Sequence, residues 1–110
     1  MKIYNRSAIT INYKKPFIDW NNALTPELQM DVAMLGESKT YLTKEVFDNV
    51  NQLIKKYYKI IFELELEGMW TDENDWPAKR DFKTFCEWFE YEISDWVVDL
   101  DNKPLIGDDF

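Results

Sequence analysis

The chain opens with a strict alternation of apolar and polar residues. Over residues 7–13 this alternation places Ile9, Ile11 and Tyr13 on one face and small or polar residues on the other. A period of two residues is typical of a strand that buries one of its faces. The sequence therefore predicts a strand at residues 7–13, and a brief β-prone segment predicts another at residues 40–42.

Helical spacing begins directly after the first strand. Pro16 stands where the missing N–H of a proline costs a helix nothing, and Phe17 and Trp20 follow at helical spacing. This pattern predicts a short helix. A second start signal at residues 25–27 predicts another short helix that ends near Gly36.

The strongest helical pattern lies at residues 44–67. Its apolar residues recur at intervals of three and four, at Val46, Val50, Leu53, Ile54, Tyr57, Ile61 and Leu64. Thr43 can cap this helix, and Glu45 falls in the first turn, where a carboxylate suits the helix dipole. Gly68 predicts its end through a left-handed C-terminal cap. The sequence therefore predicts a long central helix.

A third substantial helix is predicted after Trp76-Pro77. Its apolar face would hold Ala78, Phe82, Phe85, Cys86, Phe89 and Ile93. Alternation then returns over residues 95–100, where Trp96, Val98 and Leu100 share one side, and this predicts a closing strand. Together the elements predict one α+β domain over residues 1–110, with a small sheet of about three strands, a long central helix and shorter helices packed on one face.

Charge is divided unevenly along the sequence. The first 60 residues carry nine Lys/Arg against six Asp/Glu, whereas the last 50 carry four against fifteen and hold ten of the eighteen aromatic residues. A segment this acidic needs its aromatic residues to build a folded core, because otherwise it would stay disordered. The net charge of −8 opposes binding to phosphate backbones. We therefore expect a basic protein surface as the partner, and no nucleic acid.

The composition also excludes several kinds of chemistry. The chain has no histidine, no glycine-rich phosphate loop and no zinc-ligand spacing. Its single cysteine, Cys86, rules out an intramolecular disulfide and fits a reducing compartment. No apolar run approaches the ~20 residues of a membrane span, and none resembles a signal peptide. We expect a cytoplasmic protein that is not an enzyme, contacts no membrane and holds no metal or cofactor.

Four residues near the end of the predicted third helix are the candidate partner-binding residues: Trp88, Tyr91, Glu87 and Glu92. On a helical wheel, Trp88 and Tyr91 lie away from the apolar face and among carboxylates. An exposed ring in such surroundings could seat a basic side chain of a partner. The alternative is that Trp88 packs at the rim of the core, as large aromatic side chains usually do.

The remaining tryptophans suggest a different kind of site. Trp20, Trp70 and Trp76 could line a pocket for a small molecule, with Arg80 to orient it. The loop at residues 70–76 also holds three carboxylates, which could bind Ca²⁺ or Mg²⁺ and support metal-dependent hydrolysis, although it lacks the spacing of an EF-hand. The alternative is a capped turn that the two flanking tryptophans hold in place.

The two arginines, Arg6 and Arg80, stand among 21 carboxylates. The planar guanidinium group suits half-buried, bidentate ion pairs. We expect each arginine to form a structural ion pair with a helix carboxylate such as Glu65 or Glu92. The alternative is that either arginine binds an anionic ligand.

Short aromatic, acidic and proline motifs run through most of the chain: Pro16-Phe17, Asp19-Trp20, Tyr41-Leu42, Trp70-Thr71-Asp72-Glu73, Trp76-Pro77, Arg80, Phe85, Trp88-Phe89, Glu92, Asp99-Leu100 and Pro104-Leu105. In these motifs the chain resembles a family of small acidic bacterial proteins of uncharacterised function. The stretch from Trp76-Pro77 to Trp88-Phe89 is the most distinctive part of the resemblance, and residues 28–36 depart from the family pattern. The resemblance implies one bacterial, cytoplasmic domain and transfers no mechanism.

Overall fold

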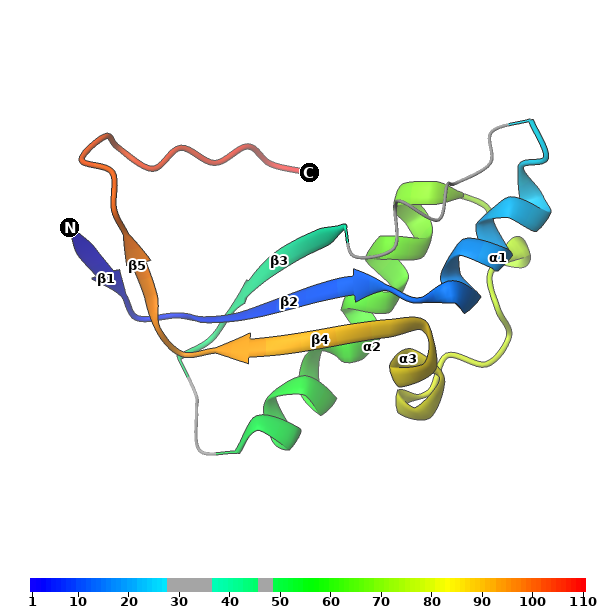
Figure 1. Ribbon diagram of the computed structural model, residues 1–110, viewed down its shortest axis with the longest axis horizontal. Coiled ribbons are helices and arrows are strands. Elements are labelled where there is room, and N and C mark those ends of the chain that lie inside the picture. The colour runs from blue at the N-terminus through cyan, green and yellow to red at the C-terminus, as the bar shows by residue number, and fades with distance from the viewer. Residues whose placement is uncertain (28–36, 46–48) are drawn as a thin grey trace.

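The structure is a computed structural model that describes residues 1–27, 37–45 and 49–110. Its central sheet has three antiparallel strands in the order β3-β2-β4 (Figure 1). Strand β2 (Ser7–Tyr13) lies in the middle, with β3 (Ser38–Thr43) and β4 (Phe89–Ser94) at the two edges. A separate antiparallel pair joins β1 (Lys2–Tyr4) to β5 (Val97–Asp99).

Helices pack against one face of the central sheet, with the longest of them crossing behind it (Figure 1). In the described part of the chain the helices are α1 (Lys15–Leu24), α2 (Val50–Met69) and α3 (Phe82–Trp88), with a short 3-10 turn η2 (Glu73–Asp75) between the last two. The predicted α+β class and the long central helix are therefore confirmed.

The core forms where the inner face of β2 meets the three helices. Ile9, Ile11 and Tyr13 are buried, as the alternation of this strand predicts. The large side chains that join them come from every helix and from β4: Phe17, Ile54, Phe62, Phe85 and Phe89. Each fully buried apolar side chain of this cluster contributes roughly 1.5–3 kcal/mol to folding.

The predicted boundaries of the long helix were wrong at both ends. Helix α2 begins at Val50, because the side chain of Asn49 accepts the Asn51 backbone N–H at 2.9 Å and caps it. Thr43, the predicted cap, belongs to β3 and donates its hydroxyl to the Ser7 carbonyl at 3.3 Å. Gly68 does not stop the helix, which continues to Met69.

The predicted third helix was also wrong beyond Trp88. Asp81 caps α3 by accepting the Thr84 N–H at 2.8 Å, and the chain is helical for only seven residues. From Phe89 onward it becomes strand β4, which pairs with β2 over six residues. Phe85, Phe89 and Ile93 are each four residues apart, and this spacing fits a helix and a strand equally well. Pairing with β2 decides the outcome in favour of the strand.

The closing strand takes a different place from the one expected. Strand β5 covers only Val97–Asp99, and it pairs with β1 rather than with the central sheet. Nothing in the alternation of the chain pointed to β1. The helix predicted to follow residues 25–27 falls at residues 28–36, which lie outside the described residues. No helix in the described ranges has the length and apolarity needed to cross a membrane.

Candidate functional site

Strand β4 divides its side chains between the core and the face of the sheet opposite the described helices. Phe89 is buried, while Tyr91 is half-buried on the same inner side. Glu90 and Glu92 alternate with them, so both carboxylates point to the other face and are exposed. Neither forms an ion pair with any described residue. β4 is therefore an edge strand that presents two uncompensated negative charges.

The sheet face beside these two carboxylates is polar. Glu92 lies opposite Thr10 of β2, whose hydroxyl shares a 2.9 Å hydrogen bond with that of Thr40 in β3. Glu90 lies opposite Asn12, whose side-chain Oδ1 is enclosed without a hydrogen-bond partner among the described residues. The exposed threonine hydroxyls can therefore accept donors from a partner, whereas the buried Asn12 oxygen cannot.

Trp88 lies at the rim of the core rather than free in solvent. It is half-buried, and its ring is packed against those of Phe17, Trp20 and Phe62 at centroid distances of 6.1, 6.0 and 5.6 Å. The Trp88 carbonyl also accepts the Lys14 backbone N–H at 2.9 Å. This arrangement matches the rim packing described above as the alternative for Trp88.

Tyr91, Glu87 and Glu92 do not form one face with Trp88. Tyr91 points to the core side of β4, where its ring lies 6.1 Å from that of Phe85, and burial raises its pKa. Glu92 points to the opposite side of the same strand, and Glu87 is exposed on α3. The structure thus separates the two candidate carboxylates from the two candidate rings. Partner binding by all four stays a prediction.

The three tryptophans of the alternative site do come together, and they hold the loop that carries Asp75. Trp20 Nε1 donates to the Asp75 carbonyl at 2.9 Å, and Trp70 Nε1 donates to the Asp75 carboxylate at 2.6 Å. Trp76 Nε1 donates to the Trp70 carbonyl at 2.7 Å. Every indole N–H is committed to the loop, so a small molecule here would find ring surfaces but no free indole donor. A ligand pocket at this place stays a prediction.

Arg80 completes this loop instead of pairing with Glu65 or Glu92. Its guanidinium carbon lies 5.6 Å from the centre of the Trp76 ring, and it donates to the Pro77 carbonyl at 3.0 Å. Its contact with the exposed Glu73 is a long 3.5 Å. Arg6 donates to the Thr43 carbonyl at 2.6 Å. The expected ion pair is thus formed by Arg80, although with Glu73 of the 3-10 turn η2, whereas Arg6 forms none with any described residue.

The acidic loop also uses its oxygen atoms internally. Asp72 accepts the Asn74 backbone N–H at 3.0 Å, while the Asp75 carboxylate is held by Trp70. Within the described ranges, no group of three or more acidic or cysteine side chains is placed to hold a metal ion. Burial raises the pKa of the Cys86 thiol, which disfavours the reactive thiolate.

The buried carboxylate of Glu65, expected above only as an ion-pair partner of an arginine, lies beneath the sheet with other partners. Glu65 of α2 is 2% exposed and accepts hydrogen bonds from the Tyr13 hydroxyl at 2.6 Å and from the Tyr41 hydroxyl. Lys39 adds an ion pair at 3.0 Å from the half-exposed end of the cluster. The sequence carried one signal for it, since Glu65 follows Ile61 by four residues and so falls within the apolar stripe of α2.

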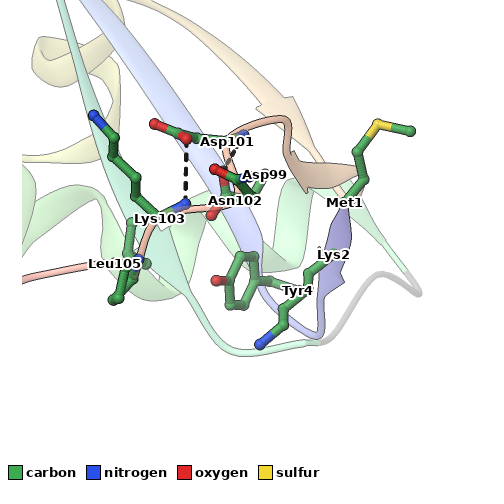
Figure 2. A pocket seen from close by; sticks show the side chains of 9 residues that line it. Met1, Lys2, Tyr4, Asp99, Asp101, Asn102, Lys103 and Leu105 are labelled. Atoms are coloured by element: carbon green, nitrogen blue, oxygen red, sulfur yellow. Dashed lines mark hydrogen bonds between the residues drawn. The ribbon is translucent and has the colours of Figure 1, made fainter.

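Two shallow grooves flank the β1–β5 pair. One, of about 410 Å³, is lined by Lys2, Tyr4, Asp99 and the turn that follows β5, and Figure 2 shows it from close by. The other, of about 450 Å³, lies between this pair and β3, with Leu42 on one side and Val97 on the other. Leu105 lines both grooves.

No family model, curated protein or solved structure matches the chain.

Proposed function

We propose that this chain is a non-enzymatic protein-interaction domain that meets a basic protein surface. The contact surface is the acidic edge, which we define as Glu87 of α3 together with Glu90 and Glu92 of β4. The observation that carries the proposal is the position of Glu90 and Glu92 on an edge strand, where both are exposed and neither has an ion-pair partner among the described residues.

Charge makes a basic partner the natural one. The last 50 residues carry fifteen acidic residues against four basic ones, so the field around the acidic edge attracts positive surfaces before contact. Complementary charge of this kind accelerates association and selects partners by sign. The exposed Thr10 and Thr40 hydroxyls of the adjacent sheet face keep acceptor lone pairs for lysine and arginine side chains.

An edge strand also suits this role because no other described strand pairs with its outer edge. Charged residues on such a strand discourage pairing with another acidic copy while leaving the edge open to a basic segment. Trp88 and Tyr91 support the edge from the core side, and the exposed parts of their rings are available to a partner.

The test compares two charge-reversed variants in native affinity purification from cell extract. One is Glu90→Lys with Glu92→Lys, and the control is Asp108→Lys with Asp109→Lys, which makes the same charge change in the exposed tail. We expect the parent and the control to retain the same proteins at low salt and to release them towards about 1 M salt, where the Debye length falls to ~3 Å. The β4 variant should retain none of them. If the β4 variant keeps the same partners with the same salt dependence, the acidic edge is not the binding surface.

A further inference from the structure

The β1–β5 pair and its flanking residues form an arm at one end of the molecule (Figure 1). We define the arm as residues 1–6 and 95–103. Ile3 lies opposite Val98, so these two side chains share one face of the pair. Trp96 and Leu100 flank Val98 two residues away on each side. These four residues make the outer arm face, which is entirely apolar.

Three of the four residues of the outer arm face lie open to solvent, whereas Val98 at its centre is half-buried. Ile3 is 56% exposed, Trp96 71% and Leu100 80%, although each is a large apolar side chain. Scattered single residues of this kind are normal on a protein surface, but a contiguous group usually marks an interaction site. The exposed Ile3, Trp96 and Leu100 on one face therefore indicate a binding surface for a partner.

The opposite face of the arm is partly covered, and the groove of about 410 Å³ lies on it. Its residues include Tyr4 and Asp99, and the turn after β5 folds back over them so that Leu105 lies beside Tyr4 (Figure 2). The Asp99 carboxylate accepts the Asp101 N–H at 2.9 Å, and the Asp101 carboxylate accepts the Lys103 N–H at 3.2 Å. The arm thus has one face partly covered by its own chain, and one face on which Ile3, Trp96 and Leu100 stay exposed.

An isolated pair of short strands is at best marginally stable in water. β1 and β5 have three residues each and pair only with one another, not with the central sheet. A cover on the outer arm face would supply the apolar burial that a lone pair of this length lacks. The arm therefore gains order from whatever occupies that face.

The charge of the arm favours a second copy of the same chain as the occupant. The whole chain has a net charge of −8, which makes two copies repel one another over most of their surface. The arm is an exception, because it holds three basic and three acidic residues: Lys2, Arg6 and Lys103 against Asp95, Asp99 and Asp101. Two arms can approach without net repulsion and can place opposite charges together around the apolar centre.

The size of the face is also adequate for a dimer. The exposed parts of Ile3, Trp96 and Leu100 amount to roughly 400 Å² of apolar surface, which is within the range of functional patches. Interfaces are about 57% apolar, so this area corresponds to about 700 Å² for each copy. A standard stable interface buries about 800 Å² for each partner.

We infer that two copies of this chain associate through their outer arm faces, related by a two-fold axis. Each copy then presents the same patch to the other, as a symmetric interface requires. The two β1–β5 pairs stack face to face, with Trp96 and Leu100 of each copy packed on the apolar side chains of the other. This interface is separate from the acidic edge on β4.

The test measures mass in solution by size-exclusion chromatography with light scattering. We expect the parent to have twice the 13.3 kDa mass of a single chain. Trp96→Gln with Leu100→Gln should raise the dissociation constant about 100-fold or more, because central large side chains dominate interface energies. The control, Ile60→Gln with Ile106→Gln, removes two exposed apolar side chains outside the arm and should stay dimeric.

A second measurement needs no variant. Amide hydrogen exchange in β1 and β5 of the parent should slow as protein concentration rises, because association orders these strands. A parent that remains a monomer, with arm amides that exchange at the same rate at every concentration, overturns the inference. A control variant that dissociates as readily as the arm variant overturns it as well, since the interface would then lie elsewhere.

Discussion

The buried Glu65 carboxylate allows a direct test of how the core is held together. Replacing Tyr13 by Phe removes the hydroxyl that donates to Glu65 at 2.6 Å. The ring itself is kept, together with its stacking on Phe17 at 4.2 Å. Tyr13 is 4% exposed, so water cannot readily take the place of the lost hydroxyl. The substitution therefore isolates one hydrogen bond to a buried charge.

The expected cost follows from the charge and from the partners that remain. A hydrogen bond to a charged group contributes about 1.5–3 kcal/mol to stability. Tyr41 and Lys39 still hold the carboxylate, so the loss stays below the 3–5 kcal/mol of a buried ion pair that is broken outright. We expect Tyr13→Phe to lower the free energy of unfolding by about 2 kcal/mol, or the melting temperature by roughly 10 °C.

The dependence on pH gives a second, independent readout. Burial first, and then the hydrogen bond to Glu65, raise the pKa of Tyr13 well above its ordinary value of 10.0. Above pH 10 the unfolded chain loses phenolic protons that the native protein keeps, so stability falls as the pH rises. Each retained proton contributes a slope of up to about 1.4 kcal/mol per pH unit, while below pH 10 it contributes none. The same causes raise the pKa of Tyr41, so Tyr13→Phe should remove only part of the alkaline slope.

Urea denaturation followed by tryptophan fluorescence measures both quantities. The matched control is Tyr58→Phe, which keeps the ring contacts to Phe82 and Phe85 at 5.3 and 5.9 Å. The Tyr58 hydroxyl has no hydrogen-bond partner in the described part of the chain, so the control should change stability by less than about 0.5 kcal/mol. If the two variants lose the same stability at neutral pH and keep the same alkaline slope, Tyr13 does not hold the Glu65 carboxylate.

Three further predictions test the boundaries of α2 and the acidic loop by thermal or urea denaturation. Gly68→Ala should stabilise the protein by about 0.5–1 kcal/mol, since Gly68 lies inside the helix and a Cβ there meets no atom within 4 Å; a left-handed cap would give a loss instead. Asn49→Ala should cost about 1 kcal/mol as the loss of a cap, whereas an interior helix position would give a gain. Millimolar Ca²⁺ or Mg²⁺ should leave the melting temperature unchanged, because the described carboxylates form no metal-binding group.

The sequence predicted elements well where one periodicity had no competitor. The alternation in β2 fits only a strand, and its predicted bounds match the structure residue by residue. The prediction was wrong where the spacing of apolar residues fitted both a helix and a strand. The four-residue intervals from Phe85 to Ile93 allow both structures, and only the pairing with β2, some 80 residues away in the chain, selects the strand. Pairing between strands so far apart in the chain cannot be detected in the pattern of a few neighbouring residues.

The candidate sites were harder to predict for a related physical reason. The helical wheel placed Trp88 and Tyr91 on an exposed acidic face. Instead, Trp88 at the end of α3 packs on rings of α1 and α2, and the change to β4 turns Tyr91 towards the core. Alternation in β4 leaves Glu90 and Glu92 outside, although the sequence analysis had named only Glu92. Burial of Glu65 depends on hydroxyls from β2 and β3, so the stripe of α2 alone could not identify its partners.

In the fold, the acidic edge and the arm differ in charge, because the acidic edge is negative and the arm is balanced. The aromatic residues of the acidic half mostly enter the core, and this leaves carboxylates on the acidic edge, while the arm combines balanced charge with an apolar face. Salt should therefore affect the two surfaces in opposite ways. Salt screens charges, so it weakens the attraction between the acidic edge and a basic partner. Salt does not weaken the apolar contact between two arms. It also reduces the repulsion between two chains that each carry a net charge of −8. If added salt releases the basic partner but leaves the dimer intact, the two contacts use separate surfaces. If added salt releases the partner and dissociates the dimer together, both contacts use the same surface.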